Sequence, residues 1–231
     1  MKITVLSGAG ISAESGIKTF RDSDGLWENY NVMDVASIEG WYKNPDLVQQ
    51  FYNERRKQLE SVEPNKAHKI LAELERDFEV EIVTQNVDNL HERAGSTKVI
   101  HLHGELTKAR SVKNSERIYE LGYREIRKGE KAEDGGLLRP HIVWFGEAVP
   151  LIEKAAEIVS QAETLIVIGT SLNVYPAAGL LEYAAGSAAI YLIDPAEVKY
   201  VGSRRITFIK EKASDGMEKM KQYLYEATGK C

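Results

Sequence analysis

The chain has 231 residues, of which 43% are hydrophobic and 28% charged, as is typical of a globular protein with a sizeable core. The formal net charge of -5 argues against a general nucleic-acid binder, whose surface would be basic. The one cysteine, Cys231, excludes an intrachain disulfide and a Cys-based zinc site, and because no segment resembles a signal peptide or a membrane span, we expect a cytoplasmic protein that binds neither membranes nor nucleic acid.

Strand-like segments recur along the chain, and several are continuous apolar runs. They lie at residues 3–7, 79–86, 99–103, 164–171, 189–194 and 205–210. Such runs are typical of parallel strands that are buried on both faces. Helical patterns lie between or beside them, at residues 44–62, 65–78, 151–162, 176–185 and 215–228. The alternation predicts an α/β fold with a Rossmann-like, doubly wound parallel sheet.

Two stretches do not follow this alternation. Residues 22–62 are mostly helical, and residues 105–139 are dense in charge and poor in apolar side chains. We interpret them as two insertions that form a smaller helical or irregular module beside the sheet. The large Rossmann-like part of this single domain would then comprise approximately residues 1–21, 63–104 and 140–231.

The first turn of the chain has the pattern of a dinucleotide-binding loop. Gly8, Gly10 and Ala13 spell G-x-G-x-x-A between a strand and a probable helix, where glycines let backbone N–H groups approach a pyrophosphate. The acidic residue expected about 20 residues later is missing, since that region, KTFRDSDGLWENYN, is no strand. Asp194 ends a later strand and could bind ribose hydroxyls, which favours NAD over NADP. A turn-forming role before Pro195 is equally compatible with its position.

Two histidines, His101 and His103, point to the same side of an extended run. Metal binding would require further ligands, and the other histidines are scattered without ligand spacing. A catalytic base is the better interpretation for one of them, because imidazole titrates near neutral pH. The other is then more consistent with a hydrogen-bonded core residue.

The motifs taken together resemble the sirtuins, NAD-dependent protein-lysine deacylases. They occur in the family's order over nearly the whole chain: GAGIS at 8–12, GIKTFR at 16–21, TQNVD at 84–88, HGEL at 103–106, RPHIVWFGE at 139–147 and GTSLNVYPAA at 169–178. The resemblance implies NAD as cofactor, acyl-lysine proteins or peptides as partners, and transfer of the acyl group to ADP-ribose with release of nicotinamide. The oligomeric state stays open, with a monomer favoured.

The resemblance, with the first turn, assigns roles to matching positions. His103 and Asn86 would be catalytic, with His103 accepting a proton relayed through the ribose hydroxyls, and His101 structural. The residues expected to bind NAD are Gly8, Ala9, Gly10, Ala13, Phe20, Arg21, Gln85, Asn86, Asp88, Gly169, Thr170, Ser171 and Asp194. The residues expected to bind the acyl-lysine substrate are Ala36, Tyr52, Arg55, Val143, Phe145, Gly146 and Val174.

The pair Tyr52 and Arg55 bears on the acyl group. The two residues are three apart and share a helix face, where a surface tyrosine beside a solvated arginine is the simpler interpretation. A Tyr-x-x-Arg pair at this place resembles the class III sirtuins, which accept succinyl- and malonyl-lysine. Guanidinium and phenol suit a carboxylate, and the small Ala36 would leave the pocket wide. We therefore expect desuccinylase, demalonylase and some deacetylase activity.

The small module departs from the family pattern. Most sirtuins hold a structural zinc there with two Cys pairs, but Ser111 and Asn114 stand at the first pair and the second pair is missing. We expect no metal, and apolar packing by Ile118, Tyr119, Leu121, Tyr123 and Ile126 in its place. Two other functions are considered: an ADP-ribosyltransferase that uses the same NAD site, and a catalytically silent module that binds NAD or acyl-lysine.

Overall fold

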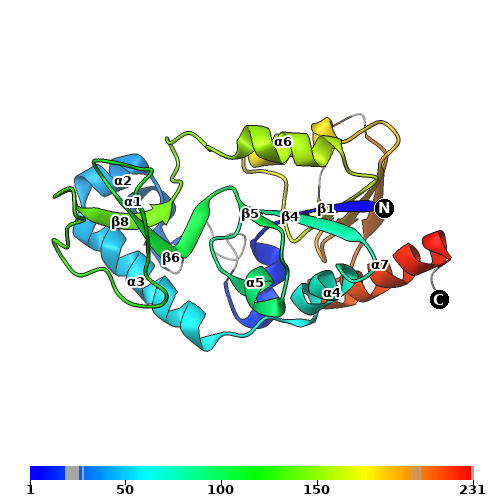
Figure 1. The fold of residues 1–231 in the computed structure, drawn as a ribbon, viewed down its shortest axis with the longest axis horizontal. Helices are drawn as coiled ribbons and strands as arrows, with labels where there is room; N and C mark the ends of the chain where they lie inside the picture. The colour runs from blue at the N-terminus through cyan, green and yellow to red at the C-terminus, as the bar shows by residue number, and fades with distance from the viewer. Residues whose placement is uncertain (19–25, 28, 199, 201, 203, 230–231) are drawn as a thin grey trace.

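The structure is a computed structural model that describes residues 1–18, 26–27, 29–198, 200, 202 and 204–229. Phe20 and Arg21, both expected at the NAD site, lie outside the described residues. Figure 1 shows a large part on the right, which carries the N-terminus and the last helix, and a smaller part at the left end. Among the described residues, no helix is both long and apolar enough to cross a bilayer.

The described part of the large half contains six parallel strands in the order β11-β10-β9-β1-β4-β5. They are β1 (Lys2–Ser7), β4 (Glu79–Thr84), β5 (Val99–His101), β9 (Thr164–Ile168), β10 (Ala189–Ile193) and β11 (Ile206–Ile209). The chain builds outward from β1 to β5 and then restarts at β9 on the other side of β1. This confirms the doubly wound sheet, and it places the reversal of strand order between β1 and β9, where such sheets bind ligands.

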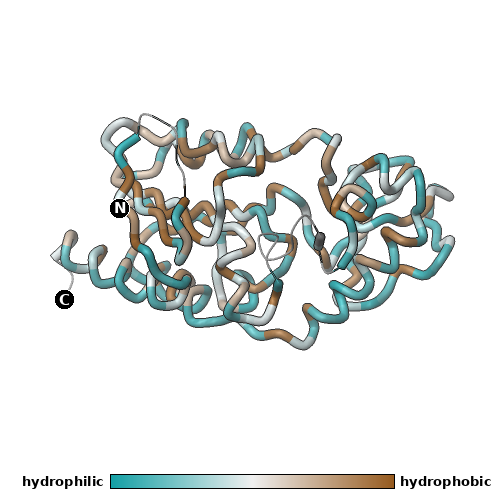
Figure 2. Tube along the Cα trace, turned by 180° about the vertical axis from the view of Figure 1, so that it is seen from behind, coloured by the Kyte–Doolittle hydropathy of each residue, from teal (hydrophilic) through white to brown (hydrophobic). Residues whose placement is uncertain are grey.

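Helices cover both faces of this sheet. In β1, Ile3 and Val5 face α4 (Lys66–Leu74) and α7 (Ala213–Thr228), whereas Leu6 faces α6 (Ile152–Ser160) and the 3₁₀ helix η3 (Ala177–Tyr183). Figure 2 shows hydrophobic segments concentrated in the strands between these layers. Because both faces are buried, polar side chains on this sheet are accommodated best at the strand ends.

The smaller part joins helices to a second sheet. Its helices are α1 (Val32–Val35), α2 (Ile38–Lys43) and α3 (Pro45–Ser61), next to a short hairpin of β2 (Leu26–Trp27) and β3 (Tyr30–Asn31). The described strands β6 (Gly104–Ser111), β7 (Ile118–Glu120) and β8 (Leu138–Ile142) form an antiparallel sheet in the order β7-β6-β8. The second insertion therefore contains an antiparallel sheet in addition to the irregular structure that the sequence predicted.

A register shift in β6 explains why this sheet was not predicted. Glu105 lies opposite His141, but Ala109 already lies opposite Pro140, so the extra residues of β6 form a bulge. The buried Leu106 and Ala109 are consequently three residues apart. Their spacing hides the two-residue alternation by which a strand is recognised in a sequence.

A polar clasp forms around Ser111, one of the positions at which the family resemblance led us to look for zinc cysteines. The Ser111 hydroxyl donates to Asp134 Oδ1 at 2.8 Å, and the same oxygen accepts the Gly136 N–H at 2.8 Å. Beneath the clasp lies a small apolar cluster, in which Leu121 and Ile126 are buried as expected. Ile118 does not belong to it, because its side chain is 49% exposed on the edge strand β7.

We expect EDTA to leave the melting temperature of this protein unchanged, because the described residues of the clasp meet through hydrogen bonds and apolar contacts. Ser111→Ala should lower the melting temperature by a few degrees, since Asp134 then loses a donor. Calorimetry of the unmodified protein and of Ser111→Ala, each with and without chelator, tests the two expectations. Stoichiometric zinc in purified protein, lost together with thermal stability on chelation, would contradict them.

Candidate active site

Two glycine loops meet at the reversal of strand order. The Gly8 N–H donates to Ile168 O at 3.0 Å, and the Gly10 N–H donates to Gly169 O at 2.8 Å. A Cβ on Gly10 would lie 2.6 Å from Gly169 Cα, and Gly169 itself has a φ of +64°. Both positions therefore require glycine. The two loops pack backbone against backbone at the place where doubly wound sheets bind dinucleotides.

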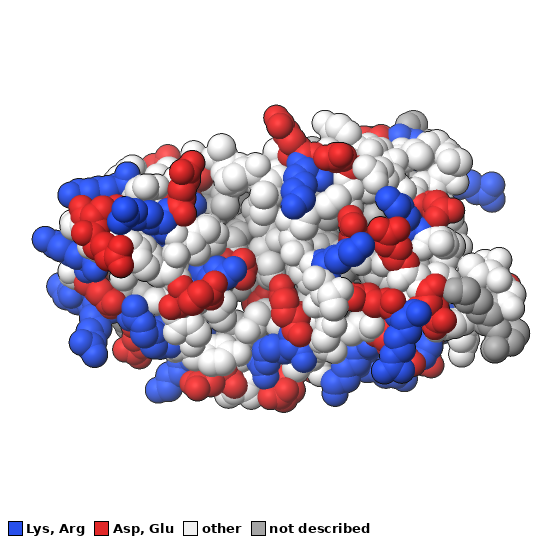
Figure 3. All heavy atoms as spheres, in the orientation of Figure 1, with Lys and Arg blue, Asp and Glu red and all other residues white. Residues whose placement is uncertain are grey.

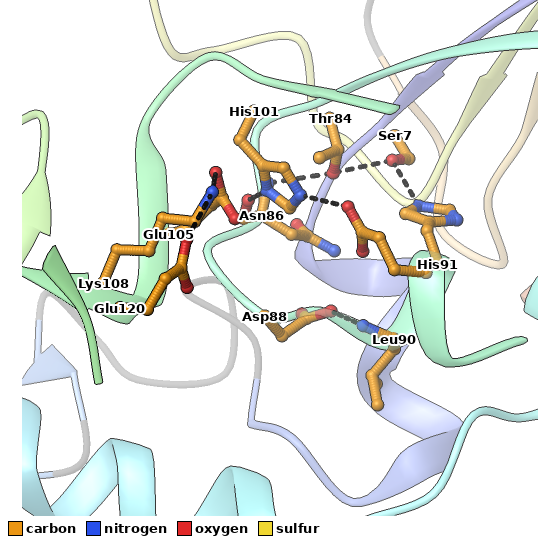
Figure 4. A network of polar contacts seen from close by, with 11 residues as sticks. Ser7, Thr84, Asn86, Asp88, Leu90, His91, His101, Glu105, Lys108 and Glu120 are labelled. Atoms are coloured by element: carbon orange, nitrogen blue, oxygen red, sulfur yellow. Dashed lines mark hydrogen bonds and ion pairs between the residues drawn. The ribbon is translucent and has the colours of Figure 1, made fainter. Parts of the chain in front are cut away.

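Side chains from two loops converge beside these glycines. The Asn86 Nδ2 donates to Ser12 Oγ at 3.2 Å, and the Ser12 hydroxyl donates to Asp88 Oδ2 at 3.0 Å. Asp88 Oδ1 accepts the Leu90 N–H at 3.2 Å, a contact drawn in Figure 4. Burial raises the pKa of Asp88, although the hydrogen bonds from Leu90 and Ser12 oppose this effect. These buried polar groups fit an amide or a sugar hydroxyl as ligand.

A second polar network holds the backbone of Asn86 (Figure 4). Thr84 Oγ1 accepts hydrogen bonds from the Ser7 hydroxyl at 2.8 Å and from the Asn86 N–H at 3.0 Å. Ser7 Oγ also lies 3.0 Å from His91 Nε2, on α5 (Leu90–Ala94). Burial holds the pKa of His91 well below its ordinary value, so this imidazole stays neutral. The backbone at Asn86 is thus fixed by groups from β1, β4 and α5.

The two histidines of the sequence motif bind consecutive carbonyls of the same loop. His101 Nδ1 lies 2.8 Å from Asn86 O, and His103 Nδ1 lies 3.0 Å from Gln85 O. A carbonyl oxygen can only accept, so Nδ1 carries the proton in both rings. Burial lowers the pKa of His103, which keeps this ring neutral at neutral pH. Its Nε2, which has no partner among the described residues, is then the basic nitrogen.

His101 differs at its other nitrogen. Its Nε2 lies 2.8 Å from Glu92 Oε1. Burial alone would lower the pKa of His101, but the hydrogen bond and the charge of Glu92 outweigh it and raise the pKa. The sequence treated the two histidines as one base and one structural residue, and that division stays a prediction. Glu92 was not singled out, because its distance from His101 along the chain carries no signal.

The segment after β8 connects His103 to the small part. The Val143 N–H donates to His103 O at 2.9 Å, and the Phe145 N–H donates to Ala36 O at 2.9 Å. The Phe145 side chain is 41% exposed, and Gly146 has a φ of +89°. These contacts bring together the expected substrate residues of both parts. Val174 belongs to another segment, the loop between β9 and η3, where its carbonyl accepts the Ala178 N–H.

A buried ion cluster anchors this segment. Arg139 binds Glu147 with two hydrogen bonds of 2.7 and 2.9 Å, and Arg110 adds contacts of 3.1 Å. Glu147 Oε2 also accepts the Trp144 N–H, and the Arg139 guanidinium lies 3.4 Å from the Trp144 ring centroid. Burial alone would raise the pKa of Glu147, but the Arg139 hydrogen bond holds it below its usual value. Sequence analysis assigned no role to these three charges.

A small pocket opens between α3 and the Asp88 loop. Its lining includes Tyr52, Arg55, Trp27, Val87 and Asp88. The Tyr52 hydroxyl accepts the Trp144 Nε1–H at 2.9 Å, so its own proton remains available for donation. Burial raises the pKa of Tyr52, which keeps the phenol neutral.

Adjacent arginines on α3 have different surroundings. Arg56 is fully buried, with Nε donating to Leu106 O and Nη1 to Asn53 Oδ1, both at 2.7 Å. Arg55 lies over the Phe51 ring and lines the pocket, and its buried Nε and Nη1 have no partner among the described residues. Buried donors without acceptors cost free energy. Arg56 also has one N–H group, on Nη2, without a partner among the described residues, but it does not line the pocket. We therefore interpret Arg55 as the arginine that can meet an anionic ligand and Arg56 as structural.

The remaining expected NAD contacts lie along the same edge. The Gln85 Nε2 donates to Thr170 Oγ1 at 3.2 Å, which joins the loops after β4 and β9. Ser171 follows on the same loop and is half-buried, and Ala13 lies on the 3₁₀ helix η1 (Ala9–Ser15) with an exposed side chain. At the end of β10, Asp194 Oδ1 accepts the Ala196 N–H at 2.9 Å. This is the turn contact that the sequence allowed as an alternative for Asp194.

A model of the Sir2 family matches residues 8–176. The chain belongs to the Sir2 family. A NAD-dependent protein deacylase of Bacteroides thetaiotaomicron is 56% identical over 230 residues, which cover 97% of this chain and 98% of the relative. A NAD-dependent protein deacylase of Helicobacter pylori is 54% identical over 224 residues and covers 97% of each chain.

Solved structures agree with this membership. A Sir2 homologue–NAD complex superposes on this chain with a TM-score of 0.87 at 38% identity, covering 98% of this chain and 90% of that one. A second Sir2 homologue, in complex with ADP-ribose, gives a TM-score of 0.89 at 38% identity, covering 99% and 93%. The predictions of a sirtuin, of its fold and of NAD as cofactor are confirmed.

Proposed function

We propose that this Sir2 protein removes acyl groups from protein lysines with NAD, and that its pocket favours acyl groups that end in a carboxylate, such as succinyl and malonyl. Its relatives support the general reaction, since they are NAD-dependent protein deacylases. One observation carries the acyl preference: the buried Nε and Nη1 of Arg55 have no partner among the described residues and line a pocket next to Asp88.

Different residues at the reversal of strand order bind different parts of the cofactor. Gly8 and Gly10 present bare backbone to the pyrophosphate, and Gln85 with Thr170 closes the edge beside it. Asn86 and Asp88 provide amide and carboxyl groups for the ribose and the carboxamide. When bound, NAD supplies the ADP-ribosyl group that takes over the acyl group as nicotinamide leaves.

His103 acts as the base. Its Nδ1–H is held by Gln85 O, so the lone pair on Nε2 is directed away from that loop and can accept a proton from a ribose hydroxyl. The lowered pKa of His103 keeps the lone pair free at neutral pH. The hydrogen bond from the Val143 N–H to His103 O supports this assignment, because Val143, which we assign to the acyl-lysine site, then lies beside this base.

The substrate lysine enters between the two parts. Val143 and Phe145 line its path, Ala36 leaves room for the acyl chain, and Gly146 and Val174 offer backbone to an extended peptide. On the face shown in Figure 3, acidic and basic side chains are interspersed, and neither sign forms a continuous patch. This face therefore carries no charged patch that would select a peptide by its charge.

Two side chains recognise the acyl carboxylate. Arg55 offers its unpartnered N–H groups, and charge-assisted bonds of this kind are about twice as strong as neutral ones. Tyr52 offers its hydroxyl proton while Trp144 holds its oxygen in place. An acetyl group would leave both sets of donors unsatisfied, which explains why the pocket should discriminate between acyl groups.

Replacement of His103 by Asn tests the reaction. We expect kcat to fall by about 100-fold to 10,000-fold, because the amide can still donate to Gln85 O but cannot accept the proton. NAD affinity, measured by calorimetry, should change little. The control is His141→Asn on β8, which should retain activity within a few-fold.

The products separate this function from ADP-ribosyl transfer. Incubation with NAD and a succinyl-lysine peptide should give acyl-ADP-ribose and free lysine peptide by mass spectrometry. If the protein or peptide became ADP-ribosylated and no acyl-ADP-ribose formed, the deacylase proposal would be wrong. Full activity of the His103→Asn protein would exclude His103 as the base.

A further inference from the structure

The hydrogen bonds of His101 define its protonation state. One ring nitrogen faces a carbonyl, Asn86 O at 2.8 Å, and the other faces a carboxylate, Glu92 Oε1 at 2.8 Å. Both partners are acceptors, so both ring nitrogens need a proton unless Glu92 itself is protonated. The raised pKa of His101 and the lowered pKa of Glu92 agree with an imidazolium paired to a carboxylate.

This ion pair lies outside the groups that hold the cofactor. The His101 side chain is buried, whereas the Glu92 side chain on α5 is 40% exposed. Through Nδ1 the pair reaches the backbone of Asn86, whose N–H is held by Thr84 and whose side chain is held by Ser12. His101 therefore supplies the third of three contacts that orient this residue, as Figure 4 shows for His101, Asn86 and Thr84.

We propose that His101 and Glu92 form a positioning pair that holds Asn86 in its catalytic orientation by binding its carbonyl oxygen. The proposal rests on the proposed function, because the catalytic role of Asn86 is assigned there. Neither His101 nor Glu92 is a catalytic residue in this account. They act on the reaction only through the backbone of the loop that also carries Gln85, whose carbonyl oxygen binds His103.

The pair predicts a pH dependence opposite in sign to that of the base. His101 has a raised pKa, so both of its hydrogen bonds are present below that pKa and one is lost as the pH rises through it. His103 has a lowered pKa and is already a free base there. Other titratable or charged groups near the pair lie on α5, on the loop before it and on β6, and are His91, Asp88, Glu105 and Lys108. We expect kcat to fall at alkaline pH as His101 loses its second ring proton.

Two replacements of His101 separate its two contacts. In His101→Asn the amide nitrogen takes the position of Nδ1 and keeps the donor to Asn86 O. In His101→Gln it takes the position of Nε2 and keeps the contact with Glu92. We expect the Asn variant to retain kcat within a few-fold and to lose the alkaline limb. The Gln variant should lose about 10-fold to 100-fold in kcat, with a smaller change in KM for NAD.

Glu92→Gln provides a variant at the half-exposed end of the pair that should fold normally. The glutamine oxygen can still accept from Nε2, but the negative charge is gone, so the alkaline limb should move to lower pH. Melting temperatures of all variants are measured alongside. Equal kcat losses in the Asn and Gln variants that follow their melting temperatures, or an unchanged pH profile in Glu92→Gln, would overturn the positioning role.

Asn86→Ala distinguishes this failure from a failure of the proposed function. If Asn86→Ala and His103→Asn both keep activity, the catalytic assignments are wrong, and the positioning pair has nothing to position. If both lose activity while the two His101 variants behave alike, the assignments stand and only the positioning pair is rejected. Loss in Asn86→Ala and His101→Gln, with activity retained in His101→Asn, supports both.

Discussion

Replacing Arg55 with Met should lower kcat/KM for a succinyl-lysine peptide by about 30-fold to 1,000-fold, since removing one partner of a buried charge pair costs about 2–4 kcal/mol. The methionine keeps an unbranched chain over the Phe51 ring and removes the N–H groups that now lack acceptors. Hydrolysis of an acetyl-lysine peptide should change only a few-fold, because an acetyl group has no carboxylate to bind. Parallel assays with the two peptides measure the ratio.

Lys57→Met is the matched control. Lys57 is exposed on the same helix and loses the same charge, but it does not line the Arg55 pocket. Its succinyl-to-acetyl ratio should equal that of the unmodified protein. Equal losses on both peptides in Arg55→Met would show that Arg55 supports folding or cofactor binding instead of acyl recognition.

Replacing Glu147 with Gln should lower the free energy of unfolding by about 3 kcal/mol, because Arg110 and Arg139 then lack their counter-charge in a mostly buried site. The estimate is at the lower end for buried pairs since the Glu147 side chain retains 19% exposure. Denaturation in urea measures this loss. Activity should fall as well, because the cluster holds the segment that carries Val143 and Phe145 next to His103.

The exposed Glu157 on α6 provides the comparison for this experiment. Glu157→Gln removes the same charge and should change the free energy of unfolding by less than about 0.5 kcal/mol. If Glu147→Gln were as stable as Glu157→Gln, the two arginines would have to be adequately solvated without their carboxylate. The ion cluster would then not be the anchor of the substrate segment.

The parallel sheet was predictable because its central strands, such as β1 and β9, are buried on both faces and read as apolar runs. Every predicted strand begins within one residue of the observed one. The errors lie at the C-terminal ends of the strands. The predictions for β4, β5 and β9 run on to residues 86, 103 and 171, whereas these strands end at Thr84, His101 and Ile168. The excess residues are those that leave the sheet to form the candidate site.

The parts that were not predictable depend on contacts between distant segments. The bulge in β6 disrupts the alternation that identifies a strand. The difference between Arg55 and Arg56 follows from the direction in which each leaves α3 and from what lies there. The proton positions of His101 and His103 require the carbonyls of a separate loop. Residue type and spacing do not contain this information.

The backbone contact between Gly10 and Gly169 has a consequence for cofactor binding. These loops interlock through main-chain atoms and a hydrogen bond of 2.8 Å, so the proposed pyrophosphate site is built from loops that hold one another directly. Binding of the cofactor there should therefore cost little entropy for ordering the loops. A side chain at either glycine would wedge the loops apart and remove this preorganisation.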